Sequence, residues 1–386
     1  MTARTPAIAG LGMTAMGKVY GKSAPQFAAQ AVTLAAADAG ISVGAIDGLL
    51  MSGGIGNDVG LDLQQRLGLG NLRLLTQLQG FGSTAGQMVQ YASMAVQSGM
   101  VDTVACVWAD APLKEDRGGG DAYREGASIP RGFGGLRASS SIYSANTMYA
   151  LAARRHMLEY GTTSDQLGHL AVAQRDWAVL NPNAQLRTPL TLDDYHASRY
   201  IAEPFHLFDC CLVSNGGIAV IVTSLDRARD LGQPPVRVLG WGQSHPGHSM
   251  QRNDDFGLVT GAATSGPGAL AMADTTLDEI DVVELYDCYT YTAMVSLEDY
   301  GFCPKGEGGA FIAQSGNLGP TGKYKVNTGG GQLSSYYMWG MTPLSEGIIQ
   351  ARGQAGERQV AAHDRVLVSG NGGILDHHST LILGTV

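Results

Sequence analysis

The same order of secondary-structure patterns occurs twice in this chain, and this repeat limits the possible folds more than any other feature. In each copy the order is helix, strand, strand, helix, strand, with apolar strand-like runs alternating with helical stretches. The segments of the first copy lie at 25–40, 46–54, 72–80, 85–99 and 101–110, and those of the second at 267–277, 280–290, 325–331, 342–353 and 364–373. This pattern predicts an α/β fold built from two duplicated halves.

A sequence of a different kind separates the two copies. Residues 113–145 are rich in Gly, Arg and Ser and have little periodicity, which in a compact domain is typical of a functional loop. We therefore expect an inserted domain of loops and helices over the active site. The predicted boundaries are 1–112, completed by 203–230, for the N-terminal half, 113–202 for the inserted domain and 231–386 for the C-terminal half.

The composition excludes some classes of partner and favours others. Charged residues make up 15% of the 386 residues, well under the usual share of about 25%, so a partner subunit is expected to cover much of the surface. The net charge of −9 argues against nucleic acid and anionic membranes as ligands. No apolar run approaches the length of a membrane span. The expected location is the cytoplasm.

The cysteine and histidine spacings give no support for a disulfide framework or a metal site. Five Cys are present, and two of them, Cys210 and Cys211, are adjacent. No C-x-x-C pair or His cluster has the spacing of zinc ligands. We therefore predict no metal and no cofactor held by this chain.

Six segments, taken in order, resemble the thiolase superfamily across essentially the whole chain, and most closely its sterol-carrier-protein-type thiolase-like branch. They are YALAARRHMLEYGTTSDQL (149–167), NPNAQLRTPLT (181–191), DCCLVSNGGIAV (209–220), VELYDCYTYTAMVSLEDYGFCPKGEGG (283–309), NTGGGQLSSYYMWGMTPLSEGIIQARG (327–353) and GNGGILDHHSTLILG (370–384). The resemblance implies a thiolase fold with five αβαβα layers, a homodimer and an acyl-CoA thioester as ligand.

The chain departs from this family where a thiolase has its nucleophile and its second Cys. The nucleophilic Cys belongs at the start of the buried helix of the first half, where helix amides lower its pKa. Gly82 stands at about that position, with Ser83 beside it, and no Ser–His–Asp arrangement is evident around Ser83. The second Cys is replaced by Gly370 or Asn371. Acyl transfer through a Cys is therefore not expected.

Two tyrosines replace the other catalytic side chains of the family. Tyr337 takes the place of a His in the turn 327–341, and Tyr286 replaces a carboxamide or His in another loop. What remains is the stabilisation of an enolate. The surviving reaction would be retro-aldol cleavage of a 3-hydroxyacyl-CoA to a ketone or aldehyde and a shorter acyl-CoA. A Tyr can act as the base if amides or a cation lower its pKa from about 10.

Thiolase-like proteins with this signature include steroid side-chain aldolases. The resemblance to them implies cleavage of a 17-hydroxy-steroid carboxyl-CoA to a 17-ketosteroid and propionyl-CoA. It also implies a small partner with an OB-fold and a zinc ribbon, in a complex of two copies of each chain. Any zinc would be in that partner.

The predicted site combines these positions. The predicted catalytic residues are Tyr286, Tyr337, His378 and Asn327, and the predicted substrate-binding residues are Gly82, Ser83, Tyr336, Gly330, Asn371 and Gly372.

Each polar member of this set has a structural alternative. The three tyrosines could serve in packing or structural hydrogen bonds, Asn327 could cap its turn, and His378 could lie in the core rather than relay a proton. Two other functions also stay open. The chain could be an acyl-CoA C-acyltransferase with Cys288 as the nucleophile, or a non-catalytic carrier of acyl-CoA or lipid.

Overall fold

The fold was analysed in a computed structural model, and part of the loop predicted at 113–145 lies outside the residues it describes. Those residues are 4–55, 58–123, 144–247 and 255–386, with the single residues 135, 139, 142 and 252.

Two halves, each with its own run of strands, share one mixed sheet in the described part of the chain. The strand order is β3-β2-β4-β7-β1-β8-β11-β10-β9. The strands of the N-terminal half are β3 (Leu74–Leu78), β2 (Gly48–Ser52), β4 (Thr103–Asp110), β7 (Gly216–Ser224) and β1 (Pro6–Met13), and those of the C-terminal half are β8 (Val236–Ser244), β11 (His377–Gly384), β10 (Arg365–Gly372) and β9 (Val282–Glu284). The halves join where Ala7 and Ile8 of β1 pair with Arg237 and Val236 of β8.

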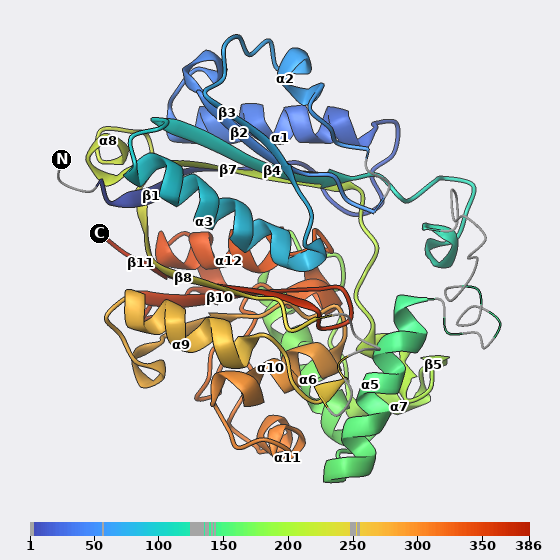
Figure 1. The fold of residues 1–386 in the computed structure, drawn as a ribbon. Coiled ribbons are helices and arrows are strands. Elements are labelled where there is room, and N and C mark those ends of the chain that lie inside the picture. Colours follow the sequence, from blue (N-terminus) through green and yellow to red (C-terminus); the bar gives the residue numbers. More distant parts are fainter. Residues whose placement is uncertain are drawn as a thin grey trace.

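Figure 1 shows that helices and strands alternate in five layers, as predicted. Helix α1 (Ala24–Ala39) covers the outer face of the upper strands, α3 (Thr84–Gln97) and α12 (Met341–Ala351) lie between the two halves, and α9 (Ala262–Met272) and α10 (Thr290–Tyr300) cover the lower strands. Helix α12 is buried on nearly all sides because strands of both halves enclose it.

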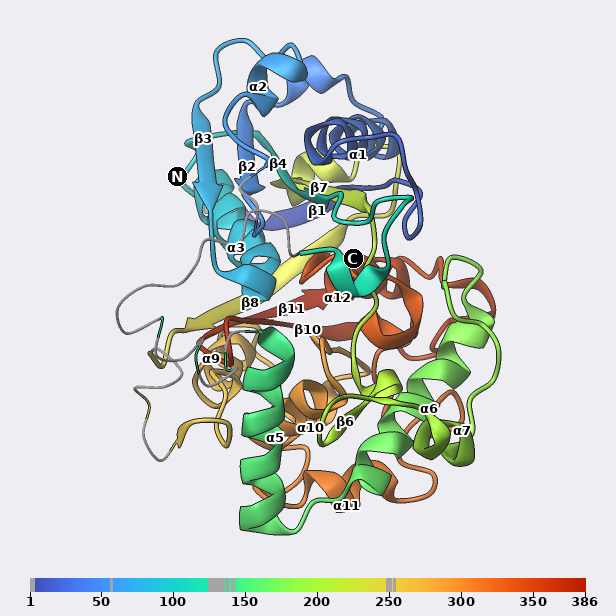
Figure 2. The same ribbon diagram turned by 90° about the vertical axis from the view of Figure 1, so that its right-hand side faces the viewer.

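The segment between the halves forms a group of helices below the C-terminal half. Its helices are α5 (Ala145–Tyr160), α6 (Ser164–Leu180) and α7 (Leu192–Ala197), followed by the short strands β5 (Tyr200–Ala202) and β6 (Phe205–His206). Helix α6 packs against α10 and against α11 (Gly308–Ala313), and in Figure 2 the helices of the inserted segment lie with α10 and α11 in the lower half of the molecule. The short helices α2 (Leu63–Arg66) and α8 (Leu225–Ala228) complete the described helices.

The second copy of the repeat is less regular than its sequence pattern suggests. The strand predicted at 280–290 ends at Glu284, and α10 begins at Thr290. The strand predicted at 325–331 is reduced to an isolated bridge between Val326 and Val283. Both strands therefore give way to loops where the candidate site lies.

Candidate functional site

Two tyrosine side chains from separate loops meet inside the protein. Tyr286 follows β9, and Tyr337 lies between the turn η8 (Gly331–Ser335) and α12. Their hydroxyl oxygens are 3.2 Å apart, within hydrogen-bond distance. Tyr286 is 4% exposed, whereas Tyr337 is partly exposed. The structure thus brings together the two residues predicted as the central catalytic pair.

The ring of Tyr286 occupies the space next to Gly82 where a longer side chain would lie. A Cβ on Gly82 would be 2.2 Å from Cε2 and 2.3 Å from Cζ of Tyr286. It would also be 2.1 Å from the backbone oxygen of Asn371, which cannot rotate away. No side chain fits at position 82 while Tyr286 keeps this place.

Three other glycines pack against the turn η2 (Phe81–Ser83), which precedes α3. A Cβ on Gly340 would be 2.2 Å from the Gly82 oxygen, and a Cβ on Gly372 would be 2.0 Å from the Gly80 oxygen. A Cβ on Gly370 would be 2.9 Å from the Gly82 oxygen. Cysteine side chains therefore have no room at Gly82 or Gly370 without movement of the backbone. The N-termini of α3 and α12 meet at the contact of Gly82 with Gly340.

The turn before Tyr337 separates the two neighbouring tyrosines. Gly330 has φ 92°, a conformation that favours glycine, and starts the π-helical turn η8. Tyr336 then points into the core, where its hydroxyl lies 3.0 Å from that of Ser345. Tyr336 is therefore a packing residue in the unbound chain, and its predicted contact with substrate stays a prediction.

Both phenols of the tyrosine pair are protonated at neutral pH. Burial raises the pKa of Tyr286 well above its ordinary value, and the neighbouring Tyr337 raises it further. Burial also raises the pKa of Tyr337 well above its ordinary value, followed by the effect of Cys211. A base of the tyrosinate type requires a lowered pKa, and the structure shows the opposite. The raised pKa values favour a mechanism in which both tyrosines are neutral.

Ser83 and Asn327 make internal hydrogen bonds. The Ser83 hydroxyl donates to the backbone oxygen of Gly80 at 2.7 Å and accepts from Nε2 of Gln87 at 2.9 Å. These bonds leave Ser83 poorly placed to act as a nucleophile. Asn327 has φ 50°, and its Oδ1 accepts the backbone N–H of Leu285 at 2.6 Å. The carboxamide of Asn327 thus ties its turn to the loop that carries Tyr286.

Asn371 and His378 lie on the other side of β10 and β11 from η2. The two residues are paired across the strands. Gly370 and Gly372, the chain neighbours of Asn371, face η2. Because side chains alternate between the two faces of a strand, the side chain of Asn371 faces away from η2. Nε2 of His378 is 3.0 Å from both the Tyr300 and the Ser369 hydroxyls, and burial lowers the pKa of His378 to about 3. His378 is therefore a neutral core histidine without a described contact to the tyrosine pair. The carboxamide of Asn371 has no hydrogen-bond partner among the described residues.

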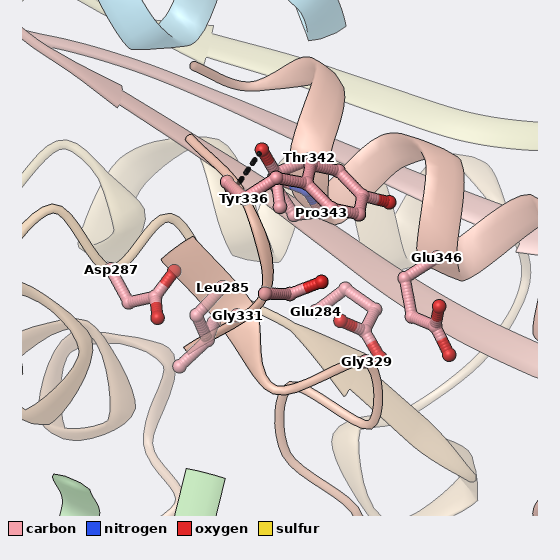
Figure 3. Close-up of a pocket in the computed structure, with 10 residues that line it drawn as sticks. Glu284, Leu285, Asp287, Gly329, Gly331, Tyr336, Thr342, Pro343 and Glu346 are labelled. Atoms are coloured by element: carbon pink, nitrogen blue, oxygen red, sulfur yellow. Dashed lines mark hydrogen bonds between the residues drawn. The ribbon is translucent and has the colours of Figure 1, made fainter. Parts of the chain in front are cut away.

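Two features of the site were missed from the sequence. Asp287 is fully buried beside a small cavity, shown in Figure 3, at the base of η8. Trp339, two residues after Tyr337, stacks on Trp108 with ring centroids 4.9 Å apart and an interplanar angle of 19°. A carboxyl group inside the apolar run ELYDCY was the only sequence signal for the first feature, and none pointed to the second.

The described residues contain no group of three or more His, Cys, Asp or Glu side chains that could hold a metal ion. Within the same residues, no helix is long and apolar enough to cross a membrane.

Comparisons with known proteins identify the family of the chain. The family described as "Thiolase C-terminal domain-like" matches residues 242–385. A "steroid side-chain-cleaving aldolase" of Thermomonospora curvata is 36% identical over 98% of this chain and 97% of its own length. A "17-hydroxy-3-oxo-4-pregnene-20-carboxyl-CoA lyase" of Mycobacterium tuberculosis is 34% identical over 98% of both chains.

Solved structures show the same likeness. A structure described as "Ltp2-ChsH2(DUF35) aldolase" has a TM-score of 0.86 and 32% identity, and covers 100% of this chain and 98% of its own. A monomeric SCP2-thiolase-like protein type 1 from Mycobacterium smegmatis has a TM-score of 0.77 at 19% identity, over 100% of this chain and 78% of its own, and so shares the fold. The resemblance drawn from the sequence is confirmed: this chain belongs to the thiolase superfamily, in its branch of thiolase-like aldolases.

Proposed function

We propose that this protein is a lyase that cleaves a 3-hydroxyacyl-CoA by a retro-aldol reaction, releasing a ketone or aldehyde and a shorter acyl-CoA. The observation that carries the proposal is the contact of Tyr286 with Gly82. The tyrosine ring fills the place of a thiolase nucleophile and sets its hydroxyl 3.2 Å from that of Tyr337. The site thus keeps groups for proton transfer, and in the described part of the chain no Cys side chain stands at the position of the thiolase nucleophile.

The proposed substrate is a steroid with a 17-hydroxyl group and a carboxyl-CoA side chain, and the products are a 17-ketosteroid and propionyl-CoA. Support comes from the names of two relatives that match nearly the whole chain, the steroid side-chain-cleaving aldolase and the 17-hydroxy-3-oxo-4-pregnene-20-carboxyl-CoA lyase.

The two neutral phenols can move one proton without forming a tyrosinate. The β-hydroxyl proton passes to the first phenol oxygen while the hydroxyl electrons form the new carbonyl group. The Cα–Cβ bond breaks, and its electron pair is delocalised from Cα onto the thioester oxygen. In the same concerted step the first phenol passes its own proton to the second across the 3.2 Å contact, and the second phenol gives its proton to Cα, so that neither phenol oxygen carries two protons at any stage. Each tyrosine ends in the protonation state in which it began.

The helix ends around the pair favour the enolate. The N-termini of α3 and α12 meet at Gly82 and Gly340, and the partial positive charge at a helix N-terminus stabilises a nearby anion. The backbone at Gly330 and Gly372 stays a proposed substrate contact, whereas the Asn371 carboxamide, predicted to bind substrate, is not a proposed contact, because that side chain points to the face of β10 away from η2.

The proposed assembly is a homodimer that binds an OB-fold and zinc-ribbon protein in a 2:2 complex. The relative of known structure is described as an aldolase together with a DUF35 partner. The five Cys of this chain are free thiols, which fits the proposed location in a reducing cytoplasm.

The test replaces each phenol by phenyl. Tyr286→Phe and Tyr337→Phe keep the ring and remove the hydroxyl, so acyl-CoA binding should survive while cleavage falls by about 10²- to 10⁴-fold. Tyr195→Phe is the matched control, because its buried hydroxyl bonds Asp209 and not the tyrosine pair. The assay measures release of the shorter acyl-CoA in the presence of the partner. If both Phe variants cleave within threefold of wild type, the mechanism is wrong.

The same assay separates the rival functions. A wild-type complex that binds 3-hydroxyacyl-CoA without cleaving it would indicate a carrier. A covalent acyl-enzyme that disappears in Cys288→Ala would indicate an acyltransferase, although burial raises the pKa of Cys288 to about 12 and so opposes its ionisation.

A further inference from the structure

The distance between the two phenols depends on how two separate loops are held together. Tyr286 belongs to the loop after β9, whereas Tyr337 follows η8, about 50 residues later. One hydrogen bond between two side chains with rotatable bonds cannot fix this distance by itself. Other contacts must fix the position of one loop relative to the other.

Asp287, the residue next to Tyr286, joins these loops. Its Oδ1 and Oδ2 accept the backbone N–H of Gln332 at 2.9 and 3.0 Å, and Oδ2 also lies 3.4 Å from the backbone N of Leu333. The side chain is 0% exposed. Gly331 makes this contact possible, because a Cβ there would be 2.1 Å from Oδ2 of Asp287 and its φ is +59°.

Gln332 in turn binds the end of the segment that carries Tyr337. Its Nε2 donates to the backbone oxygen of Trp339 at 2.7 Å, and its backbone oxygen accepts the N–H of Leu212 at 3.0 Å. The backbone N–H of Tyr337 donates to the Ser214 hydroxyl at 3.0 Å. The segment around Tyr337 is thus held at its start by Asp287 and at its end through Gln332.

We propose that Asp287 is a positioning residue for the tyrosine pair: its carboxylate locks η8 to the loop of Tyr286 and so sets the separation of the two phenol oxygens. This inference rests on the proposed function, because it assigns Asp287 a part in the same proton transfer. Asp287 does not touch the substrate. Figure 3 shows it on the opposite side of the cavity from Glu346.

The hydrogen bonds between Asp287 and η8 explain why a carboxylate is needed at this position. A carboxylate only accepts hydrogen bonds, so both of its oxygens can face amide N–H groups. Asn in its place has one acceptor, and its NH₂ group would face an N–H donor. Burial raises the pKa of Asp287 to about 7, and the N–H groups of Gln332 and Leu333 oppose that shift because they stabilise the charged form.

The test is Asp287→Asn in the complex with the partner protein. A displacement of about 1 Å in a reacting group can lower a rate about 100-fold, so we expect kcat to fall between about 10- and 100-fold. KM for the 3-hydroxyacyl-CoA should stay within about twofold of wild type, because the contacts with the substrate are kept. A rise in KM with unchanged kcat would assign Asp287 to substrate binding and overturn the proposal.

A double-mutant cycle separates positioning from general stability. In the Tyr337→Phe background the pair is already broken, so Asp287→Asn should lower kcat by less than about threefold more. An equal loss in both backgrounds would refute the proposal. If Asp287→Asn does not fold, Asp287→Ser, which keeps one acceptor oxygen, takes its place in the cycle.

Asp209→Asn is the matched control. Asp209 is also fully buried and accepts hydrogen bonds from the Tyr195 and Thr290 hydroxyls and from the backbone N–H of His206, and none of these partners belongs to η8. This variant should lose stability and keep kcat within about threefold. If Asp209→Asn lowers kcat as much as Asp287→Asn, the loss of activity comes from removing a buried charge in general, and the proposal fails.

A wild-type complex that does not cleave would count against the proposed function. An active wild type with an equally active Asp287→Asn variant would count against the role of Asp287 alone.

Discussion

Gly82→Ala tests the central feature of the site, the close packing of Tyr286 against the start of α3. The added methyl carbon would lie 2.2 Å from Cε2 of Tyr286 and 2.1 Å from the Asn371 oxygen. Gly82 is not among the glycines with positive φ, so Ala meets no backbone strain there. The expected effect is therefore steric alone.

The size of the effect follows from these distances. Non-bonded carbon atoms rest about 3.5 Å apart or more, so the ring of Tyr286 must move by more than about 1 Å. A misplacement of that size costs a rate factor of about 100, and overpacking a buried site costs about 1–3 kcal/mol of stability. We therefore expect Gly82→Ala to fold, with lower stability, and to cleave about 100-fold more slowly.

The assay follows release of the shorter acyl-CoA, with binding of the intact substrate and thermal unfolding measured separately. Gly268→Ala is the control, because its Cβ would meet nothing within 4 Å and it lies exposed in α9. That variant should keep its activity and gain up to about 1 kcal/mol from helix propensity. A Gly82→Ala variant with wild-type activity and stability would refute the assigned place of the Tyr286 ring.

Three further predictions concern the thiols, the oligomer and the pH dependence of stability. Iodoacetamide at pH 7 should leave activity intact, because burial raises the pKa of all five Cys thiols, to about 12 for Cys288 and Cys303; inactivation that substrate prevents would contradict this. Light scattering should show a homodimer at micromolar concentration, because β3 is an edge strand with apolar residues on both faces, and a lone monomer would disprove it. Burial raises the pKa of Asp209 to about 6 from about 4 in the unfolded chain, so this group should lower the free energy of unfolding by up to about 3 kcal/mol as pH rises from about 4 to about 6. Urea unfolding of Asp209→Asn should lack that slope, and an unchanged slope would show that Asp209 titrates normally.

The helix ends and the order of elements were accessible from the sequence, because local chemistry fixes them. The helix predicted at 25–40 ends at Gly40, which adopts the left-handed conformation with φ 73°. The extent of β9 was not accessible. The run from 280 to 290 is rich in β-branched and aromatic residues like a strand, but β10 pairs with it only as far as Glu284. The strand β9 ends where its pairing with the distant strand β10 ends, and the local sequence pattern does not show this point.

The candidate site was predicted in part. The meeting of Tyr286 and Tyr337 was expected from the resemblance to thiolases, which locates both loops. The raised pKa values of these tyrosines were not expected, because they depend on how much of the surrounding chain excludes water. Asp287 was missed for a similar reason: a carboxyl group in a buried run does not reveal which amide groups it will face.

The stack of Trp108 on Trp339 makes the site visible to spectroscopy. The chain has four Trp, and this pair couples a strand of the first half to the residue that follows the tyrosine turn. Indole rings 4.9 Å apart couple their electronic transitions, which gives a paired signal of opposite signs in circular dichroism. Any variant or ligand that shifts the turn should change that signal, whereas a variant that removes only a hydroxyl should leave it intact. The protein therefore carries an optical reporter of its own active-site geometry.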